Sequence, residues 1–324
     1  MQLHDKIYIA GHRGLVGSAL LRQLMALGYQ NLFYYTHDEL DLVDQQVVQC
    51  FFKKVQPDYV FLAAAKVGGI LANSRYPAQF IYNNLAIQNN VLHEAYRAGV
   101  KRLIFLGSSC IYPRECSQPI QESYLLTGPL ESTNRAYAVA KIAGAEMCWA
   151  YNKEYQCQYM VGMPSNVYGP YDNYDLEDSH VMAGLIRRFH EAKENNLSAM
   201  KVWGSGQAKR EFLYSEDLAD ACCFLMNLPN EKVEEFCRQD APPLINLGSG
   251  EDIQISELVS LVKDIVGYRG DVQWDTSKPD GTPRKLLDVS LLRHWGWAPK
   301  ISFKDGILRA YQHYLDRLKQ NAFG

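Results

Sequence analysis

The chain has 324 residues, which suits one large α/β domain or two lobes that share a boundary. Its 33 basic and 36 acidic side chains give a formal net charge of −3, so no strong basic field is available to attract nucleic acid or an anionic membrane surface. A hydrophobic fraction of 47% and a charged fraction of 21% exclude a disordered or fibrous chain.

The eight cysteines contain no C-x-x-C pair, and we interpret them as reduced thiols of a cytoplasmic protein without a signal segment. The most apolar early run, from Val60 to Ala65, ends at Lys66, far short of the roughly 18 to 20 residues that a membrane-spanning helix needs. No cysteine and histidine cluster has the spacing of a metal site, and no internal repeat is present. These features predict a soluble enzyme without a structural metal.

The first half of the chain alternates short apolar runs with amphipathic stretches, the pattern of parallel strands joined by helices. The run 59–65 is continuously apolar, as a strand covered on both faces must be. Strands are expected at 6–10, 32–35, 59–65, 102–106 and 158–163, and helices at 14–28 and 83–98. This order predicts a Rossmann-type α/β fold with a doubly wound parallel sheet and right-handed crossovers.

After Gly169 and Pro170 the sequence changes to a polar, aromatic loop, where a smaller second lobe is expected to begin. Short strands are expected at 201–203, 211–214 and 244–247, and a loop at 274–281. We expect interleaved lobes. Residues 1–169 with about 215–250 form the dinucleotide-binding domain, and about 170–214 with 251–324 form an α/β lobe for the substrate.

Three glycines directly follow the first expected strand: Gly11, Gly14 and Gly17, at a spacing of three and three. Such a turn lets the backbone approach a pyrophosphate, and the next helix presents free N–H groups and its positive dipole end to the anion. Glycines that serve only a tight turn are the alternative. The position between a strand and a helix favours a dinucleotide site.

The end of the second expected strand indicates which dinucleotide binds. An NAD enzyme places Asp or Glu there against the ribose 2′-hydroxyl, whereas this strand ends in Tyr35, Thr36 and His37. Arg13 in the glycine turn can meet a 2′-phosphate, with His37 assisting, so NADP(H) is favoured. Asp41 is placed to accept a hydrogen bond from the adenine amino group, although a surface carboxylate explains it nearly as well.

A serine, a tyrosine and a lysine are suited to reduce a ketone. Ser108 follows the strand 102–106 at the carboxyl edge of the sheet, and Tyr137 and Lys141 lie one turn apart on a later helix. Reduction leaves an alkoxide that needs a proton, and the ammonium of Lys141 stabilises the phenolate of a tyrosine that exchanges this proton. Ser108 can hold the carbonyl oxygen. A buried core tyrosine and a solvated lysine are the alternatives.

These motifs resemble the extended short-chain dehydrogenase/reductases that modify nucleotide sugars. Four longer segments resemble the GDP-L-fucose synthase family, and the resemblance spans essentially the whole chain: 10–17, 63–70, 106–113 and 277–288. The resemblance implies that GDP-4-keto-6-deoxy-D-mannose is epimerised at C3 and C5 and reduced at C4 with NADPH to give GDP-L-fucose.

The resemblance also assigns residues. Epimerisation needs a base and an acid on opposite faces of the sugar, and the family's cysteine and histidine correspond to Cys110 and His180. The substrate set corresponds to Arg188, Trp203, Arg210 and Asp280, since guanidinium groups suit a diphosphate and an indole suits a stacked guanine. Further cofactor contacts are expected from His12, Leu15, Val16, Leu42, Leu106, Gly107, Ser108, Ser109, Lys141, Pro164, Ser165, Asn166, Val167 and His180.

A departure concerns His37, where a bacterial member of the family has arginine, so the preference for NADP over NAD could be weaker here. In this superfamily, two helices pair with their equivalents in a second subunit as a four-helix bundle, which predicts a homodimer through 83–98 and 135–155. Trp149, Tyr151 and Tyr155 of the second helix can serve this interface or the core.

Three alternatives stay open for the function. A GDP-L-colitose synthase acting on a 3-deoxy sugar or a GDP-heptose enzyme would share nearly every motif. A catalytically silent NADP-binding protein is the third alternative. It would have no need to keep all five residues that carry the chemistry: Ser108, Cys110, Tyr137, Lys141 and His180.

Overall fold

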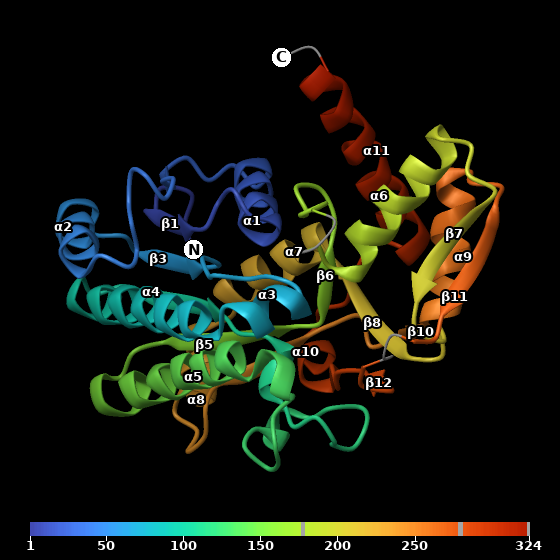
Figure 1. Ribbon diagram of the computed structural model, residues 1–324. Helices are drawn as coiled ribbons and strands as arrows, with labels where there is room; N and C mark the ends of the chain where they lie inside the picture. The colour runs from blue at the N-terminus through green and yellow to red at the C-terminus, as the bar shows by residue number, and fades with distance from the viewer. Residues whose placement is uncertain (176–178, 278–280, 323–324) are drawn as a thin grey trace.

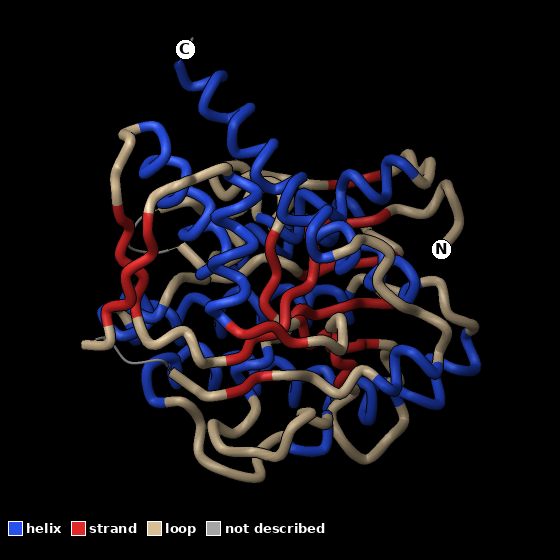
Figure 2. The backbone as a smooth tube through the Cα atoms, turned by 90° about the vertical axis from the view of Figure 1, so that its right-hand side faces the viewer, coloured by secondary structure: helices blue, strands red, loops and turns tan. Residues whose placement is uncertain are grey.

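The computed structural model describes residues 1–175, 179–277 and 281–322 of the chain. Its centre is a six-stranded sheet in which all neighbouring strands are parallel. The strands of this sheet gather in the middle of the molecule, with helices around them (Figures 1 and 2). In spatial order the strands are β2 (Leu32–Phe33), β1 (Ile7–Ala10), β3 (Tyr59–Leu62), β4 (Arg102–Leu106), β5 (Tyr159–Pro164) and β9 (Leu244–Leu247). The chain order reverses between β1 and β3, which opens a crevice at the carboxyl ends of these strands. The predicted Rossmann-type sheet is confirmed.

Helices cover both faces of this sheet, and each face has its own apolar core. Alternate strand residues supply the two cores: in β4, Ile104 belongs to one, and Leu103 and Phe105 belong to the other. The first core includes α1 (Leu15–Ala26), α7 (Ser215–Met226) and α8 (Asn230–Cys237), and the second includes α2 (Gln45–Val55), α4 (Pro77–Arg97) and α5 (Arg135–Tyr155). Helices α4 and α5 lie side by side along their length (Figure 1).

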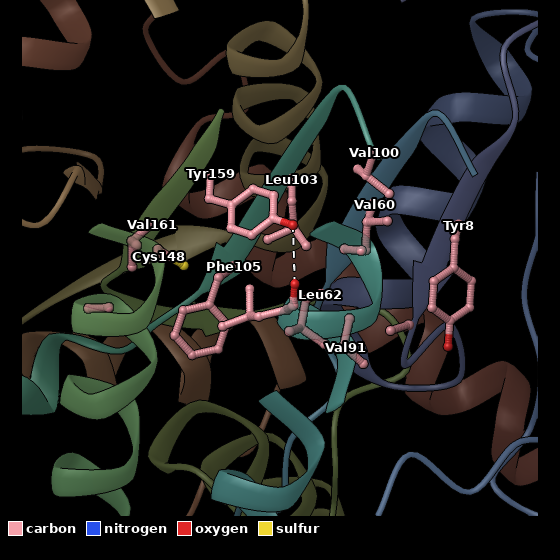
Figure 3. Packing of buried hydrophobic residues seen from close by; sticks show 14 of the residues in the cluster. Tyr8, Val60, Leu62, Val91, Val100, Leu103, Phe105, Cys148, Tyr159 and Val161 are labelled. Atoms are coloured by element: carbon pink, nitrogen blue, oxygen red, sulfur yellow. Dashed lines mark hydrogen bonds between the residues drawn. The ribbon is translucent and has the colours of Figure 1, made fainter. Parts of the chain in front are cut away.

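A buried hydrogen bond joins the sheet to α4 (Figure 3). The hydroxyl of Tyr159 in β5 donates to the carbonyl oxygen of Leu92 in α4 at 3.1 Å, among fully buried side chains. Helix α5 packs directly on the strands β4 and β5. Because α5 is held in this way, Tyr137 and Lys141 lie near the carboxyl end of β4.

The rest of the chain forms a smaller α/β part beside the six-stranded sheet (Figure 1). Its third apolar core lies among three helices: α6 (Val181–Glu194), α9 (Ile255–Val266) and α11 (Phe303–Ala322). One sheet contains β8 (Lys209–Tyr214), β6 (Asn166–Tyr168), β10 (Asp252–Gln254) and β12 (Arg284–Lys285), and a parallel pair contains β7 (Ala199–Trp203) and β11 (Asp271–Asp275). Two short helices, α3 (Ile70–Arg75) and α10 (Ser290–His294), complete the described α-helices. The exact boundaries of the two lobes stay a prediction.

The elements differ from the predictions at some of their ends. Strand β3 stops at Leu62, because the residues that follow leave the sheet and line a cavity. Helix α4 begins at Pro77 rather than at residue 83, since a proline is well accommodated in the first helical turn. The expected loop 274–281 was partly wrong, because Trp274 and Asp275 pair with Val202 and Trp203 in a parallel ladder.

Candidate active site

A cavity of about 1430 Å³ opens at the carboxyl ends of the central strands. It is lined by the glycine turn after β1, the segment after β3, the start of α5, residues 164–167 and part of α11. The predicted catalytic residues that line it are Ser108, Cys110, Tyr137, Lys141 and His180. The predicted cofactor residues that line it are Gly11, Arg13, Gly14, Leu15, Val16, Gly17, His37, Asp41, Leu42, Leu106, Gly107, Ser109, Pro164, Ser165, Asn166 and Val167.

The glycine turn forms a cradle that fits a dinucleotide. Gly11 has a φ of +89°, and a Cβ atom there would lie 2.8 Å from the backbone nitrogen of Ala64. A Cβ atom on Gly17 would lie 2.0 Å from the carbonyl oxygen of Gly11. Gly14 caps the N-terminus of α1 without a side-chain hydrogen bond, so the first N–H groups of the helix can bind a phosphate. The backbone is therefore close-packed on the protein side and open toward the cavity.

Replacing Gly17 by alanine is expected to lower the free energy of unfolding by about 1–3 kcal/mol, because the added methyl group has no space against Gly11. Gly14→Ala is the matched control, since its Cβ atom would meet its nearest atom at an ordinary 3.5 Å. Chemical denaturation of both variants without nucleotide measures the difference. Equal stability of the two variants would contradict the described turn.

The expected adenosine end of the site contains Arg13, His37 and Asp41. Arg13 is exposed and lines the cavity. A carboxylate oxygen of Asp41 accepts a hydrogen bond from the backbone N–H of Val43 at 2.9 Å and lies 3.6 Å from Nδ1 of His37. Asp41 thus stabilises its own turn through the hydrogen bond from Val43, and it also lines the cavity. Its expected contact with adenine stays a prediction.

His12 does not line the cavity, although it belongs to the glycine turn. Its ring packs on Tyr34 with 5.0 Å between the ring centroids. Nδ1 of His12 is buried without a hydrogen-bond partner among the described residues, and burial lowers the pKa of the imidazole. The side chain of His12 therefore packs against Tyr34 on the side of the turn that does not line the cavity.

Lys141 and Tyr137 lie close together in the lining of the cavity. The ammonium of Lys141 donates to the carbonyl oxygen of Leu106 at 2.7 Å and lies 5.7 Å from the centroid of the Tyr137 ring. Burial lowers the pKa of Lys141 to about 8. Burial, followed by Cys110, raises the pKa of Tyr137, while a hydrogen bond with Ser108 opposes this shift. Tyr137 is therefore a neutral phenol that can donate a proton.

Cys110 and His180 reach the cavity from different segments. Cys110 lies in the short helix η1 (Ser109–Ile111), and its backbone N–H donates to Oγ of Ser108 at 3.4 Å. Burial raises the pKa of its thiol. His180 precedes α6 and is accessible from the cavity, and the surrounding protein lowers the pKa of its imidazole. The cavity is thus lined by a neutral thiol and a neutral imidazole, and each of them can exchange a proton with a molecule bound there.

The expected substrate residues lie outside the cavity lining. Arg188 in α6 donates a hydrogen bond to the carbonyl oxygen of Lys201, and Trp203 at the end of β7 is exposed. Arg210 in β8 lies opposite Lys285 of β12, which does line the cavity. All three lie on elements of the smaller part of the molecule, and their expected contact with the substrate stays a prediction. The remaining residue of this set, Asp280, lies outside the described residues.

The sequence assigned no role to several polar residues that line the cavity. They include Lys66, Asn73, Asn134, Asp172 and Lys285. Lys66 and Lys285 fall within the segments 63–70 and 277–288, on which the family resemblance rests. Their place in these segments is the sequence signal that could have identified them as site residues. Among the residues that the structure describes, no group of three or more His, Cys, Asp and Glu side chains is arranged to hold a metal ion. The described helices also include none that is long and apolar enough to cross a membrane.

A Rossmann-type sheet, a glycine cradle and a serine, tyrosine and lysine set at one cavity define a dinucleotide-dependent oxidoreductase. The chain belongs to the NAD dependent epimerase/dehydratase family, whose model matches residues 7–247. Among its relatives are GDP-L-fucose synthases, which confirms the family resemblance seen in the sequence.

The relatives match the chain over nearly its full length. The chain is 56% identical to the putative GDP-L-fucose synthase 2 of Arabidopsis thaliana, over 97% of this chain and 93% of that protein. It is 49% identical to the GDP-L-fucose synthase of Escherichia coli K12, over 96% of this chain and 97% of that protein. A solved GDP-D-glycero-L-gluco-heptose synthase from Campylobacter jejuni, studied in the presence of NADPH, has a TM-score of 0.90 at 38% identity and covers 97% of this chain and 99% of its own.

Proposed function

We propose that the chain converts GDP-4-keto-6-deoxy-D-mannose and NADPH into GDP-L-fucose, with epimerisation at C3 and C5 and reduction at C4 in one site. One observation carries this proposal. The groups suited to ketone reduction and a separate thiol and imidazole pair line the same cavity. A simple ketone reductase needs only the first set, whereas inversion of a carbon centre needs a second acid and base.

The cradle of Gly11, Gly14 and Gly17 holds the cofactor. Arg13 and His37, which line the same cavity, supply the positive charge for the 2′-phosphate of NADP. Residues 164–167 close the nicotinamide end. When bound, the reduced nicotinamide supplies the hydride for C4. A protein in the presence of NADPH among the similar solved structures supports this choice of cofactor.

Epimerisation uses the acidity of the carbons next to the 4-keto group. A base removes the proton from C3 or C5, and the electron pair of the broken C–H bond moves to the carbonyl oxygen as an enolate. The acid on the opposite face then protonates the carbon, which inverts it. Cys110 and His180 form this pair, since they reach the cavity from η1 and from the segment before α6.

Reduction at C4 leaves an alkoxide that must be protonated. The neutral phenol of Tyr137 donates this proton, and Ser108 holds the same oxygen by a hydrogen bond. The ammonium of Lys141, fixed on the carbonyl oxygen of Leu106, stabilises the phenolate that remains. The low pKa of Lys141 means that this charge is present only below about pH 8.

The rate of reduction is therefore expected to fall as the pH rises through about 8, because Lys141 loses its proton there. Below this pH the ammonium of Lys141 stays charged, so its contribution to the rate of reduction is constant. The measurement is kcat/KM for NADPH oxidation across the pH range. In a Lys141→Arg variant with residual activity, the fall near pH 8 should disappear, since a guanidinium stays protonated throughout. A wild-type profile that stays flat well above pH 8 would contradict this role.

The related substrates fit less well. The heptose synthase among the solved structures is 38% identical, compared with 56% and 49% for the two GDP-L-fucose synthases. A GDP-L-colitose synthase would have no hydroxyl-bearing C3 to invert. A silent NADP-binding protein has no use for Cys110 and His180 at a cavity that also contains Tyr137 and Lys141.

The GDP moiety binds on the smaller lobe, formed by residues of about 170–214 and 251–324. Arg188 and Arg210 provide guanidinium groups for the diphosphate, and the exposed ring of Trp203 provides a face for the guanine. Asp280 completes the set as the family resemblance implies.

We place the working enzyme in the cytoplasm as a homodimer. Its eight free cysteines suit a reducing compartment. Helices α4 and α5 lie side by side, and they expose Tyr82 at 66% and Val139 at 37%, which suits a four-helix bundle between two subunits. Light scattering should give twice the chain mass, and a Tyr82→Arg/Val139→Arg variant should shift toward the monomer. A monomeric wild type would contradict the proposed dimer.

The direct test mixes the purified chain with GDP-4-keto-6-deoxy-D-mannose and follows the absorbance of NADPH. Stoichiometric oxidation is expected, with NADH as a poorer hydride donor. Oxidation that yields another sugar would move the substrate to a related GDP-sugar. No oxidation despite tight NADPH binding would support the silent binder instead.

A further inference from the structure

Lys285 is a further cation at the cavity, and the reaction described above gives it no role. It ends β12, lines the cavity and is half-buried. In the ranges that the structure describes, its ammonium makes no hydrogen bond or ion pair with another side chain. An unpaired ammonium in a partly buried position is unfavourable unless an anion forms beside it.

The backbone around Lys285 is held on both sides. On one side, β12 pairs with β8, so that Lys285 lies opposite Arg210. On the other side, the N–H of Leu286 donates to Oε1 of Gln118, and the N–H of Ile120 donates to the carbonyl oxygen of Leu286, each at 2.8 Å. The backbone that carries the ammonium is therefore paired or hydrogen-bonded on two sides.

Glu211 adds a buried anchor one residue further along β8. Its carboxylate is fully buried and accepts hydrogen bonds from the N–H groups of Leu287 at 2.9 Å and Gly250 at 2.7 Å. A buried carboxylate that is saturated by backbone donors holds the segments that meet it at a defined distance. This anchor fixes the segment that carries Lys285 relative to the cavity.

The geometry that links Lys285 to Cys110 is the shared cavity, because both side chains line it. Of the cations that favour the charged form of this thiol, Lys285 acts more strongly than Lys141. Burial lowers the pKa of the Lys285 ammonium and the charge of Arg210 adds to this shift, whereas Cys110, Cys116 and Glu131 oppose it. Lys141 is already bound to the carbonyl oxygen of Leu106, which leaves Lys285 as the less engaged cation.

We infer that Lys285 is a positioning residue that stabilises the thiolate of Cys110 during epimerisation. The part of this inference that concerns epimerisation rests on the proposed function. The sulfur must pass through the thiolate whether it takes a proton from the sugar carbon or gives one to the enolate. In either direction the S–H bond exchanges for a C–H bond, and the fixed ammonium of Lys285 balances the negative charge on sulfur.

The test measures the reactivity of Cys110 in the full chain without any sugar. Iodoacetamide alkylates the thiolate, and mass spectrometry of the Cys110 peptide gives its labelling rate from about pH 6 to about pH 10. Lys285→Met is expected to shift the labelling profile upward by about one pH unit, which lowers the rate near neutral pH about tenfold. Lys285→Arg should stay within about threefold of the wild type, because it keeps the charge.

Lys209→Met is the matched control, since Lys209 is an exposed lysine of the adjacent strand and does not line the cavity. It should label as the wild type does. An identical labelling profile in Lys285→Met and Lys209→Met would overturn the inference. NADPH binding by fluorescence reports whether each variant is folded, and Lys285→Arg keeps the test open if Lys285→Met does not fold.

A second readout separates this inference from the proposed function. With GDP-4-keto-6-deoxy-D-mannose in D2O, Lys285→Met should slow deuterium exchange at C3 and C5 about tenfold while NADPH affinity is unchanged. If the wild type shows no exchange at all but the labelling profile still depends on Lys285, the substrate assignment fails and the effect on the thiol stands. A rise in KM with unchanged exchange and unchanged labelling would instead make Lys285 a substrate-binding residue and contradict the inference.

Discussion

Replacing Tyr137 by phenylalanine is expected to lower the rate of NADPH oxidation by about 100- to 10,000-fold, the range typical of a lost general acid. The phenol of Tyr137 is the neutral acid beside the cavity, and the ammonium of Lys141 lies 5.7 Å from its ring. Phenylalanine keeps the ring, including its edge-to-face contact with Phe80, and removes only the hydroxyl. The expected loss is therefore chemical rather than structural.

The matched control for this variant is Tyr76→Phe, which removes a hydroxyl from an exposed tyrosine that precedes α4 and does not line the cavity. It should keep the wild-type rate. The Tyr137→Phe variant should still exchange the protons at C3 and C5 with solvent, because Cys110 and His180 are intact. Reduction at more than a tenth of the wild-type rate would show that another group supplies the proton.

Replacing Cys110 by serine is expected to block epimerisation, with deuterium incorporation at C3 and C5 slowed by about 100-fold or more. A serine hydroxyl is a far weaker acid than a thiol, so it does not form the anion that the proton exchange requires. Because Cys110 lies in η1 beyond the glycine cradle, NADPH binding should be unchanged. Proton NMR of the sugar in D2O measures the exchange, and a nucleotide titration measures binding.

Cys50→Ser serves as the control, since Cys50 is an exposed cysteine of α2. It should incorporate deuterium at the normal rate. Normal incorporation in Cys110→Ser would remove Cys110 from the epimerisation, and loss of NADPH binding in this variant would show that the substitution disturbs the cofactor site as well.

The central sheet could be predicted because its signals are local. Apolar runs such as 59–65 and 102–106 identify buried parallel strands, and Gly11, Gly14 and Gly17 identify the turn between a strand and a helix. The strand ends were less predictable. Trp274 and Asp275 sit among turn-forming residues, and only their pairing with β7, far away in the sequence, makes them part of a strand.

The same distinction applies to the candidate site. Tyr137 and Lys141 are one helical turn apart, so the sequence places them together. Lys285 and Cys110 are far apart in the sequence, and they line one cavity only because β12 joins β8 and because Gln118 and Glu211 bind the backbone beside Lys285. The spacing of such residues in the sequence does not predict that they line the same cavity. His12 shows the converse, because it belongs to the glycine turn and yet its ring packs on Tyr34 outside the cavity.

The most direct measurement is proton NMR of the product formed from GDP-4-keto-6-deoxy-D-mannose and NADPH in D2O. We expect GDP-L-fucose with deuterium at C3 and C5 and with hydrogen from the cofactor at C4, because two carbons exchange with solvent and one receives a hydride. A reduced sugar that keeps the D-manno configuration and carries no deuterium at C3 and C5 would contradict the account, since it would leave Cys110 and His180 without a reaction.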